Sequence, residues 1–224
     1  MYNDLFQMIR SHFGTDEFIP LHEPRFSALD KEFVVDAIDS TFVSSVGAYV
    51  DRFEKELADY LGVKHAVVTV NGTSALQVAL RMAGVAPDDE VLTQALTFVA
   101  TANAIVYNNA TPVFLDVDRD RMGLSPDAVQ AFLQEHTEKR DGAVFNKTSG
   151  RRISAIVPMH TFGHPCRIEE LCAVADQWGI PVLRMLPRHL VVLLKVSNAG
   201  LSGIWAFLAL MGTKRLPAAV AVRL

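Results

Sequence analysis

The sequence predicts an α/β fold with a mainly parallel sheet and helices on both faces, and two observations support this. Short runs rich in Val, Ile, Leu and Ala alternate with segments of helical periodicity between residues 65 and 183. Each run passes into the next helix through a few Gly, Ser, Thr or Asn residues. Such alternation is typical of strands joined by crossover helices that cover the sheet on both sides.

The elements can be assigned in order. Residues 1–25 are predicted to form an N-terminal arm, because their start is amphipathic and charged and does not resemble a signal peptide. A helix is predicted over 27–38 with Ser27 as its N-cap, and another over 50–61, ended by Gly62. Residues 135–152 are polar and are expected to form an exposed loop. The predicted strands cover 65–70, 90–93, 111–116, 153–158 and 180–183, and the helices between them 75–83, 97–107, 125–134 and 168–178.

Composition excludes several classes of protein. The net charge of −4 and the scattered basic residues give no reason to expect nucleic acid, and Lys147, Arg151 and Arg152 are expected in a solvated loop. Cys166 and Cys172 have no metal-ligand spacing, so we expect no metal site and a reducing, cytoplasmic location. The apolar segment 199–212 is shorter than the ~20 residues that span a bilayer, so no membrane association is expected.

The clearest local signal is the strand–NGTSAL–helix junction at residues 70–76. Gly72 permits close approach of a ligand to the backbone, Thr73 and Ser74 offer hydroxyls, and the following helix presents free N–H groups at its positive end. These features are typical of a phosphate site. Simple capping of the turn by Asn71, Thr73 or Ser74 is the alternative explanation, and the turn taken alone slightly favours it.

Other strand ends carry further candidates. Phe98 could stack on a flat heteroaromatic ring, or it could belong to the core. His160 could contact a cofactor or substrate, or it could be a hydrogen-bonded structural histidine. Asp116 and Asp118 are expected to cap or turn the chain rather than to act as an acid–base pair.

Five stretches in this order resemble the DegT/DnrJ/EryC1/StrS family of sugar aminotransferases, which use pyridoxal phosphate on the aspartate-aminotransferase fold. The matching stretches are FVSSVGAYVDRFE at 42–54, VNGTSAL at 70–76, LTFVATAN at 96–103, PVFLDVD at 112–118 and IVPMHTFGHP at 156–165. The SSVG and FGHP details look most like the branch that aminates UDP-linked 4-keto sugars. The resemblance implies that residues 26–183 are the N-terminal part of the large domain of this fold, which would therefore be incomplete.

The resemblance also implies roles for matching residues. Gly72, Thr73 and Ser74 would hold the cofactor phosphate, Phe98 would lie against its pyridine ring, and His160 would contact the cofactor. A nucleotide sugar and an amino donor such as glutamate would be the substrates, and a homodimer the working form. Family members also need an aspartate that pairs with the pyridine nitrogen and a lysine that forms the Schiff base. Neither motif is present in this sequence, so no catalytic residue is assigned and the binding of pyridoxal phosphate by this chain is in question.

Residues 184–224 differ in character from the preceding chain. All 25 acidic residues precede Arg184, and the tail is apolar and basic. Codons that can encode Arg184 to Val192 also permit Asp-Ala-Ala-Glu-Ala-Leu-Gly-Ser when read from the third base, and the same offset permits Ser-Phe-Asn-Gly-Asn-Lys ending at Lys214. We therefore hypothesise that one base is missing near the Leu183 codon and that the tail is translated out of frame. The chain would then be an inactive, truncated form.

Two alternatives remain open at this stage. A homologue without the lysine could serve as a non-catalytic binding or dimerisation subunit. Alternatively, the tail could be an authentic segment that associates with membranes.

Overall fold

The computed structural model describes residues 2–20, 26–43, 47–61, 64–185, 191–196 and 203–209. The chain divides into two compact units, one of Met1–Val43 with Gly212–Leu224 and one of Ser44–Met211. The second unit contains the sheet and all the candidate site residues.

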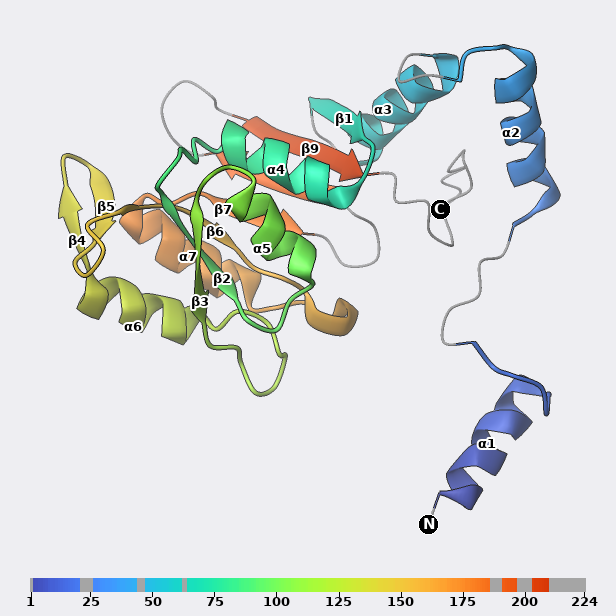
Figure 1. Cartoon of the computed structure of the whole chain (residues 1–224), viewed down its shortest axis with the longest axis horizontal. Coiled ribbons are helices and arrows are strands. Elements are labelled where there is room, and N and C mark those ends of the chain that lie inside the picture. Colours follow the sequence, from blue (N-terminus) through green and yellow to red (C-terminus); the bar gives the residue numbers. More distant parts are fainter. Residues whose placement is uncertain are drawn as a thin grey trace. The chain divides into compact units, whose positions relative to one another are not determined.

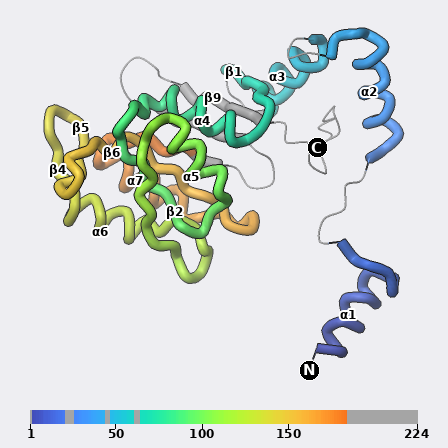
Figure 2. Tube along the Cα trace, viewed as in Figure 1, coloured from blue at the N-terminus to red at the C-terminus, as the bar shows by residue number. Residues whose placement is uncertain are grey.

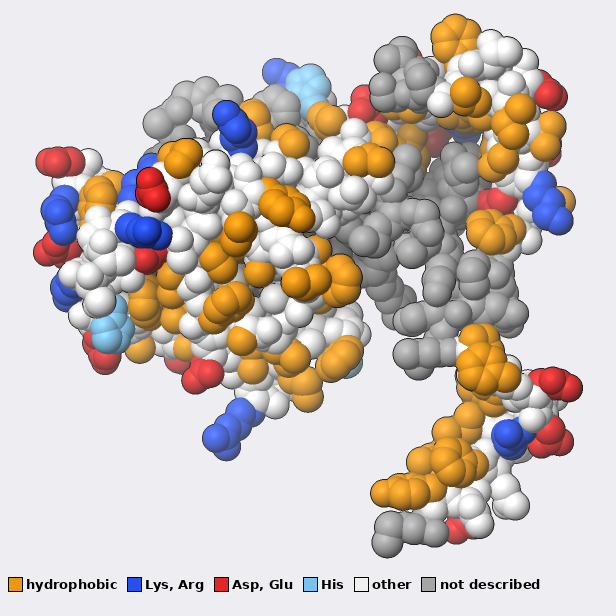
Figure 3. Space-filling view, in the orientation of Figure 1, with side chains coloured by type: hydrophobic (Ala, Val, Ile, Leu, Met, Phe, Trp, Pro, Cys, Tyr) orange, Lys and Arg blue, Asp and Glu red, His pale blue; other side chains and the backbone are white. Residues whose placement is uncertain are grey.

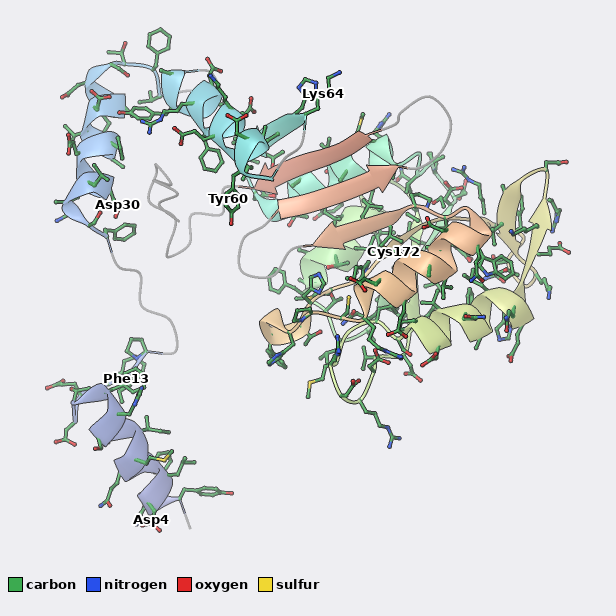
Figure 4. The ribbon with its side chains drawn as sticks, turned by 180° about the vertical axis from the view of Figure 1, so that it is seen from behind. Asp4, Phe13, Asp30, Tyr60, Lys64 and Cys172 are labelled. Atoms are coloured by element: carbon green, nitrogen blue, oxygen red, sulfur yellow. The ribbon has the colours of Figure 1, made fainter. Side chains whose placement is uncertain are left out.

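The described part of the first unit consists of α1 (Asn3–Phe13) and α2 (Ala28–Asp39). A capping box starts α2: the Ser27 hydroxyl accepts the Asp30 N–H at 3.3 Å, and the Asp30 carboxylate accepts the Ser27 N–H at 2.6 Å. Asp30 lies in the first turn of this helix (Figure 4). The prediction of Ser27 as N-cap is confirmed, whereas Gly62, the expected end of the next helix, lies outside the described residues.

The second unit alternates helices and strands for most of its length (Figure 1). Its helices are α3 (Ala48–Leu61), α4 (Gly72–Met82), α5 (Val99–Val106), α6 (Pro126–His136) and α7 (Ile168–Trp178), with a 3₁₀ turn at Thr161–Gly163. Its strands are β1 (His65–Thr69), β2 (Glu90–Gln94), β3 (Thr111–Leu115), β4 (Thr137–Arg140), β5 (Ala143–Asn146), β6 (Arg152–Val157), β7 (Val182–Met185), β8 (Val191–Val196) and β9 (Gly203–Ala209).

The sheet has the main order β1-β9-β8-β7-β6-β2-β3. Strands β1, β9, β7, β6, β2 and β3 run in the same direction, because β8 is antiparallel to both β7 and β9 and the other neighbouring pairs are parallel. The prediction of a mainly parallel sheet is therefore confirmed. The ends of β1, β2, β3 and β6 lie at its carboxyl edge, and from them the chain enters α4, α5, α6 and α7. The trace can be followed by colour from β1 through α4 and β2 to α5 (Figure 2).

Helices cover both faces of the sheet, as predicted, and side-chain alternation along the strands explains how. Val91 of β2 packs with α4 and α5 in one buried cluster, whereas its neighbour Leu92 packs with α6 and α7 in the other. In β7, Leu183 belongs to the first of these clusters and Val182 to the second. Because successive side chains of a strand point to opposite faces, two adjacent apolar residues supply both cores.

The structure differs from the sequence expectations in two places. Residues 135–152 do not form a loop: they contain the end of α6 and a β4–β5 hairpin that pairs with β6. Arg152 is half-buried rather than freely solvated, and its guanidinium bonds the buried Asp89 carboxylate and the Gly84 carbonyl. The sheet also continues past residue 183, where we expected it to stop, since β8 and β9 lie between β7 and β1.

Candidate functional site

The start of α4 provides a polar, partly open surface directly after β1. Asn71 is the N-cap, and its Oδ1 accepts the Ser74 N–H at 2.8 Å. The N–H groups of Gly72 and Thr73 have no carbonyl of their own helix within reach, because they belong to its first turn. Gly72 is buried, whereas Thr73 and Ser74 are half-buried. Capping and anion binding are therefore compatible here, because Asn71 accepts the Ser74 N–H and leaves the N–H groups of Gly72 and Thr73 available to an anion.

Phe98 occupies the corresponding junction between β2 and α5. It is the residue before the first turn of α5, and its side chain is 59% exposed. The alternative that Phe98 belongs to the core is therefore wrong. The backbone around it is held by neighbours, with the Thr97 hydroxyl 2.9 Å from the Thr101 hydroxyl and 3.0 Å from the Met159 sulfur.

These two junctions line one pocket of about 320 Å³. Its lining residues are Asn71, Thr73, Ser74, Gln77, Phe98, Val99, Ala100, Asn103 and Tyr107. Three of the residues expected from the sequence, Thr73, Ser74 and Phe98, are thus brought together, with Gly72 between Asn71 and Thr73 on the same turn. The volume lies at the small end of the range for ligand pockets, about 300–1,000 Å³.

The pocket suits a phosphorylated aromatic ligand in three respects. The helix start supplies N–H donors and a partial positive charge for a phosphate, Thr73 and Ser74 supply hydroxyls, and Phe98 supplies an exposed ring face. The lining contains no carboxylate that would repel an anion, and no lysine. The residues present therefore fit the phosphate and ring of pyridoxal phosphate but offer no amine to hold its aldehyde.

His160 lies elsewhere on the carboxyl edge. It is 6% exposed, and its Nδ1 accepts the Cys166 N–H at 3.0 Å. Among the described residues it is not part of the pocket lining. An acceptor Nδ1 requires a neutral ring with its proton on Nε2, which agrees with a structural histidine. Contact of His160 with a cofactor stays a prediction.

Asp118 turns the chain and also forms an ion pair. Its backbone accepts the Met122 N–H at 2.9 Å and donates to the Gly123 carbonyl at 2.8 Å. Its carboxylate binds Arg167 through two bonds of 3.0 and 2.7 Å. These bonds are the main cause that holds the pKa of Asp118 below its usual value and raises the pKa of Arg167. Asp116 accepts the Ser125 N–H with its backbone, so neither aspartate lines the pocket.

Sequence reasoning missed several residues of the site. Gln77 and Tyr107 line the pocket from α4 and the end of α5 and lie outside every matching stretch, and Asn103 ends the 96–103 stretch but was given no role. Helical spacing carries the available signal, because Gln77 and Asn103 follow Ser74 and Val99 by one turn. Lys214, the lysine nearest to the expected catalytic position, lies outside the described residues.

The described residues show neither a metal cluster nor a membrane-spanning helix. Within the described part of the chain, no group of three or more His, Cys, Asp and Glu side chains could hold a metal ion. No helix in the described ranges is long and apolar enough to cross a bilayer.

Comparison with known proteins identifies the class to which this fold and site belong. Residues 25–184 match the DegT/DnrJ/EryC1/StrS aminotransferase family, and the chain belongs to that family. Its structural relatives include DesI in the presence of its TDP-sugar product, with a TM-score of 0.59, 32% identity, and coverage of 78% of this chain and 41% of that one.

Curated relatives agree. The chain is 32% identical over 196 residues to GDP-perosamine synthase of Caulobacter vibrioides, covering 88% of this chain and 48% of the relative. It is 35% identical over 167 residues to GDP-perosamine synthase of Escherichia coli O157:H7, covering 75% and 42%. The chain therefore spans about half the length of the curated relatives it matches.

Proposed function

We propose that this chain supplies the phosphate- and ring-binding part of a pyridoxal-phosphate-dependent aminotransferase of nucleotide-linked 4-keto sugars. One observation carries the proposal: the start of α4 and Phe98 line a single pocket at the carboxyl edge of the sheet. Ligands of open α/β sheets bind at this edge. Family membership adds the reaction class.

Each residue has a distinct task in this proposal. The N–H groups of Gly72 and Thr73 and the hydroxyls of Thr73 and Ser74 bind the phosphate. Phe98 stacks on the pyridine ring and excludes water from one face. When bound, pyridoxal phosphate acts as the electron sink for amino-group transfer. The chain's own residues therefore position the cofactor, and the described pocket lining contains no lysine.

Two of the relatives support the substrate class. A GDP-perosamine synthase and a structure with a TDP-sugar product both concern sugars linked to nucleoside diphosphates. We propose such a sugar as substrate, a UDP-linked 4-keto sugar of the bacillosamine or legionaminic type, with glutamate as a suitable amino donor. Cys166 and Cys172 form no disulfide, which supports a location in the cytoplasm.

We also propose that residues 184–224 are read out of frame and that this chain by itself has no aminotransferase activity. Support comes from the loss of acidic residues after Leu183 and from the second frame, which permits both missing motifs. Sequencing the coding DNA around codon 183 tests the frame. A codon series that does not permit Asp-Ala-Ala-Glu in the second frame would contradict it.

Cofactor binding can be tested on the chain as it is. We expect reversible binding of pyridoxal 5′-phosphate, measured by equilibrium dialysis, with competition by inorganic phosphate. Thr73→Val should weaken both ligands, because it removes a hydroxyl from the phosphate end. Phe98→Leu should weaken pyridoxal 5′-phosphate by about three- to tenfold and leave inorganic phosphate unchanged, because only the ring contact is lost.

Borohydride treatment separates reversible from covalent binding. We expect mass spectrometry to find no stoichiometric adduct at one lysine of this chain. A stoichiometric adduct would refute the inactivity proposal, and equal binding by Thr73→Val and the unaltered chain would refute the site.

A second function, as a non-catalytic subunit that pairs with another copy, is favoured by one observation. Apolar side chains gather over α5 on one face of the second unit (Figure 3). Phe98, Val99, Val106 and Tyr107 are each 53–61% exposed. Such a patch is typical of an interface. Analytical ultracentrifugation tests this function: a monomer at high concentration would exclude it, and Val106→Asp should dissociate a dimer.

A further inference from the structure

Gln94, the last residue of β2, is a fully buried amide at the carboxyl edge of the sheet. Its Oε1 accepts two backbone N–H groups, from Leu124 at 2.7 Å and Met159 at 3.1 Å. Its Nε2 lies within bonding distance of the Leu96 carbonyl at 2.9 Å and the Met122 carbonyl at 3.2 Å. One side chain thus joins the segments that follow β2, β3 and β6.

These contacts fix the orientation of the amide. With Nε2 in place of Oε1, two donors would face the N–H groups of Leu124 and Met159, and an oxygen would face two carbonyls. Nε2 also donates to the Thr161 hydroxyl at 3.0 Å, and that hydroxyl donates to the Met122 carbonyl at 2.7 Å. Because the amide is buried, losing these bonds leaves backbone groups unsatisfied in the interior.

The network reaches Phe98 from two directions. The Leu96 carbonyl, bonded to Gln94, is two residues before Phe98. Met159, whose N–H is bonded to Gln94, receives the Thr97 hydroxyl on its sulfur at 3.0 Å. Phe98 itself is 59% exposed, so its own packing restrains the ring only weakly. Its position depends on the backbone that Gln94 holds.

We propose that Gln94 is a positioning residue that holds the Leu96–Phe98 backbone so that the Phe98 ring lies over the pocket at the start of α4. Gln94 does not touch the ligand in this role and acts through Leu96 and Met159. The proposal rests on the proposed function only in taking the bound ligand to be pyridoxal phosphate. The restraint on the three segments is independent of it.

The test compares two near-isosteric substitutions in adjacent residues of β2. Gln94→Met removes every hydrogen bond that the Gln94 amide makes. Thr93→Val is the matched control, because Thr93 is equally buried and its hydroxyl donates one bond, 2.8 Å long, to the Val157 carbonyl. Hydrogen exchange by mass spectrometry should be faster at residues 95–98, 122–124 and 159–161 in Gln94→Met. It should be unchanged there in Thr93→Val.

Affinity measurements add a readout that a general loss of stability would not produce. Gln94→Met should weaken pyridoxal 5′-phosphate about tenfold more than Thr93→Val, a coupling of the size found between contacting groups. In a Phe98→Leu background, Gln94→Met should have little further effect, because the ring it positions is gone. Inorganic phosphate should bind all four variants alike.

Unchanged exchange in the three segments would overturn the proposal, as would an equal loss of affinity with and without Phe98. If the unaltered chain binds no pyridoxal 5′-phosphate, the proposed function fails, and the exchange comparison still decides the role of Gln94. If Gln94→Met does not fold, Thr161→Val provides the milder change, since it removes one partner of Nε2. It should give the same exchange pattern at a smaller amplitude.

Discussion

Arg167 joins three segments at the scale of single residues. Besides its two bonds to Asp118, it contacts Asp127 at 2.7 Å and Glu170 at 3.0 Å. Asp118 is 8% exposed, whereas the Asp127 and Glu170 side chains are largely solvated. The bidentate pair with Asp118 therefore dominates, because exposed ion pairs contribute little.

The pair predicts a pH dependence of stability. Folding lowers the pKa of Asp118. The ion pair therefore adds to the free energy of unfolding above the pKa of an unfolded aspartate, about 3.9, and this stabilisation is lost as the pH falls through the lower pKa of the folded protein. Asp118→Asn should lower the melting temperature at neutral pH. The difference from the unaltered chain should shrink below about pH 4. Melting temperatures of both proteins across pH test this, with Asp120→Asn as an exposed control; a constant difference would contradict it.

Gly123 marks a close approach between two segments. A Cβ built there would overlap the Cβ of Cys166 and lie 3.0 Å from its Cα. Gly123→Ala should therefore destabilise the protein by about 1–3 kcal/mol through overpacking, measured by urea unfolding. Gly142→Ala is the control, because a Cβ at residue 142 would meet no neighbouring atom. Its only cost in stability is the strain of an alanine at positive φ. Equal losses in the two variants would show that close packing is not the cause.

At the scale of the elements, local sequence signals mark the starts of several helices. Ser27, Asn71 and Ser125 each begin a helix by accepting an N–H of its first turn. Such signals can be read from sequence because cap and helix are neighbours in the chain. The β4–β5 hairpin could not be read in this way. Its exposed, charged β4 gives no apolar signal, and it depends on pairing with β6.

The cap of α4 gives a prediction at the scale of the element. Asn71→Ala should cost about 1 kcal/mol of unfolding free energy, because the Ser74 N–H loses its acceptor. The freed N–H adds a donor at the phosphate end. Binding of inorganic phosphate, measured by calorimetry, should therefore persist in this variant. Ser125→Ala, which removes the cap of α6, should cost a similar amount; loss of phosphate binding in Asn71→Ala alone would contradict this division of roles.

At the scale of the whole molecule, the proposed frame change after residue 183 would leave the site without its reactive lysine and aspartate. The backbone of β8 and β9 occupies the sheet between β7 and β1, so an apolar tail can extend the sheet whatever its reading frame. Backbone hydrogen bonding and apolar content suffice for strand pairing, whereas chemistry needs particular side chains. After such a frame change, a chain can therefore keep its strand pairing and still lack the side chains that catalysis needs.

Restoring the frame supplies the corresponding prediction. Inserting one base near codon 183 should produce a chain with the Asp-Ala-Ala-Glu and Ser-Phe-Asn-Gly-Asn-Lys motifs. That chain should bind pyridoxal 5′-phosphate covalently, with a visible absorption band that borohydride abolishes. The unaltered chain and a frame-restored chain with the motif lysine changed to alanine should not. A frame-restored chain without the band would contradict the proposed frame.

The sequence by itself determined the α/β class, the alternation of elements from 65 to 183, the helix caps and the family, because these depend on neighbouring residues and on motifs in a fixed order. It also singled out Thr73, Ser74 and Phe98, each directly after a strand. The tertiary structure decided that these three line one pocket, that Phe98 is exposed, and that His160 bonds Cys166. It also decided that Gln94 joins three loops. The pocket and the Gln94 network depend on contacts between residues far apart in sequence, such as Gln94 with Leu124 and Met159, and such contacts exist only once parallel strands have brought their carboxyl ends to one edge.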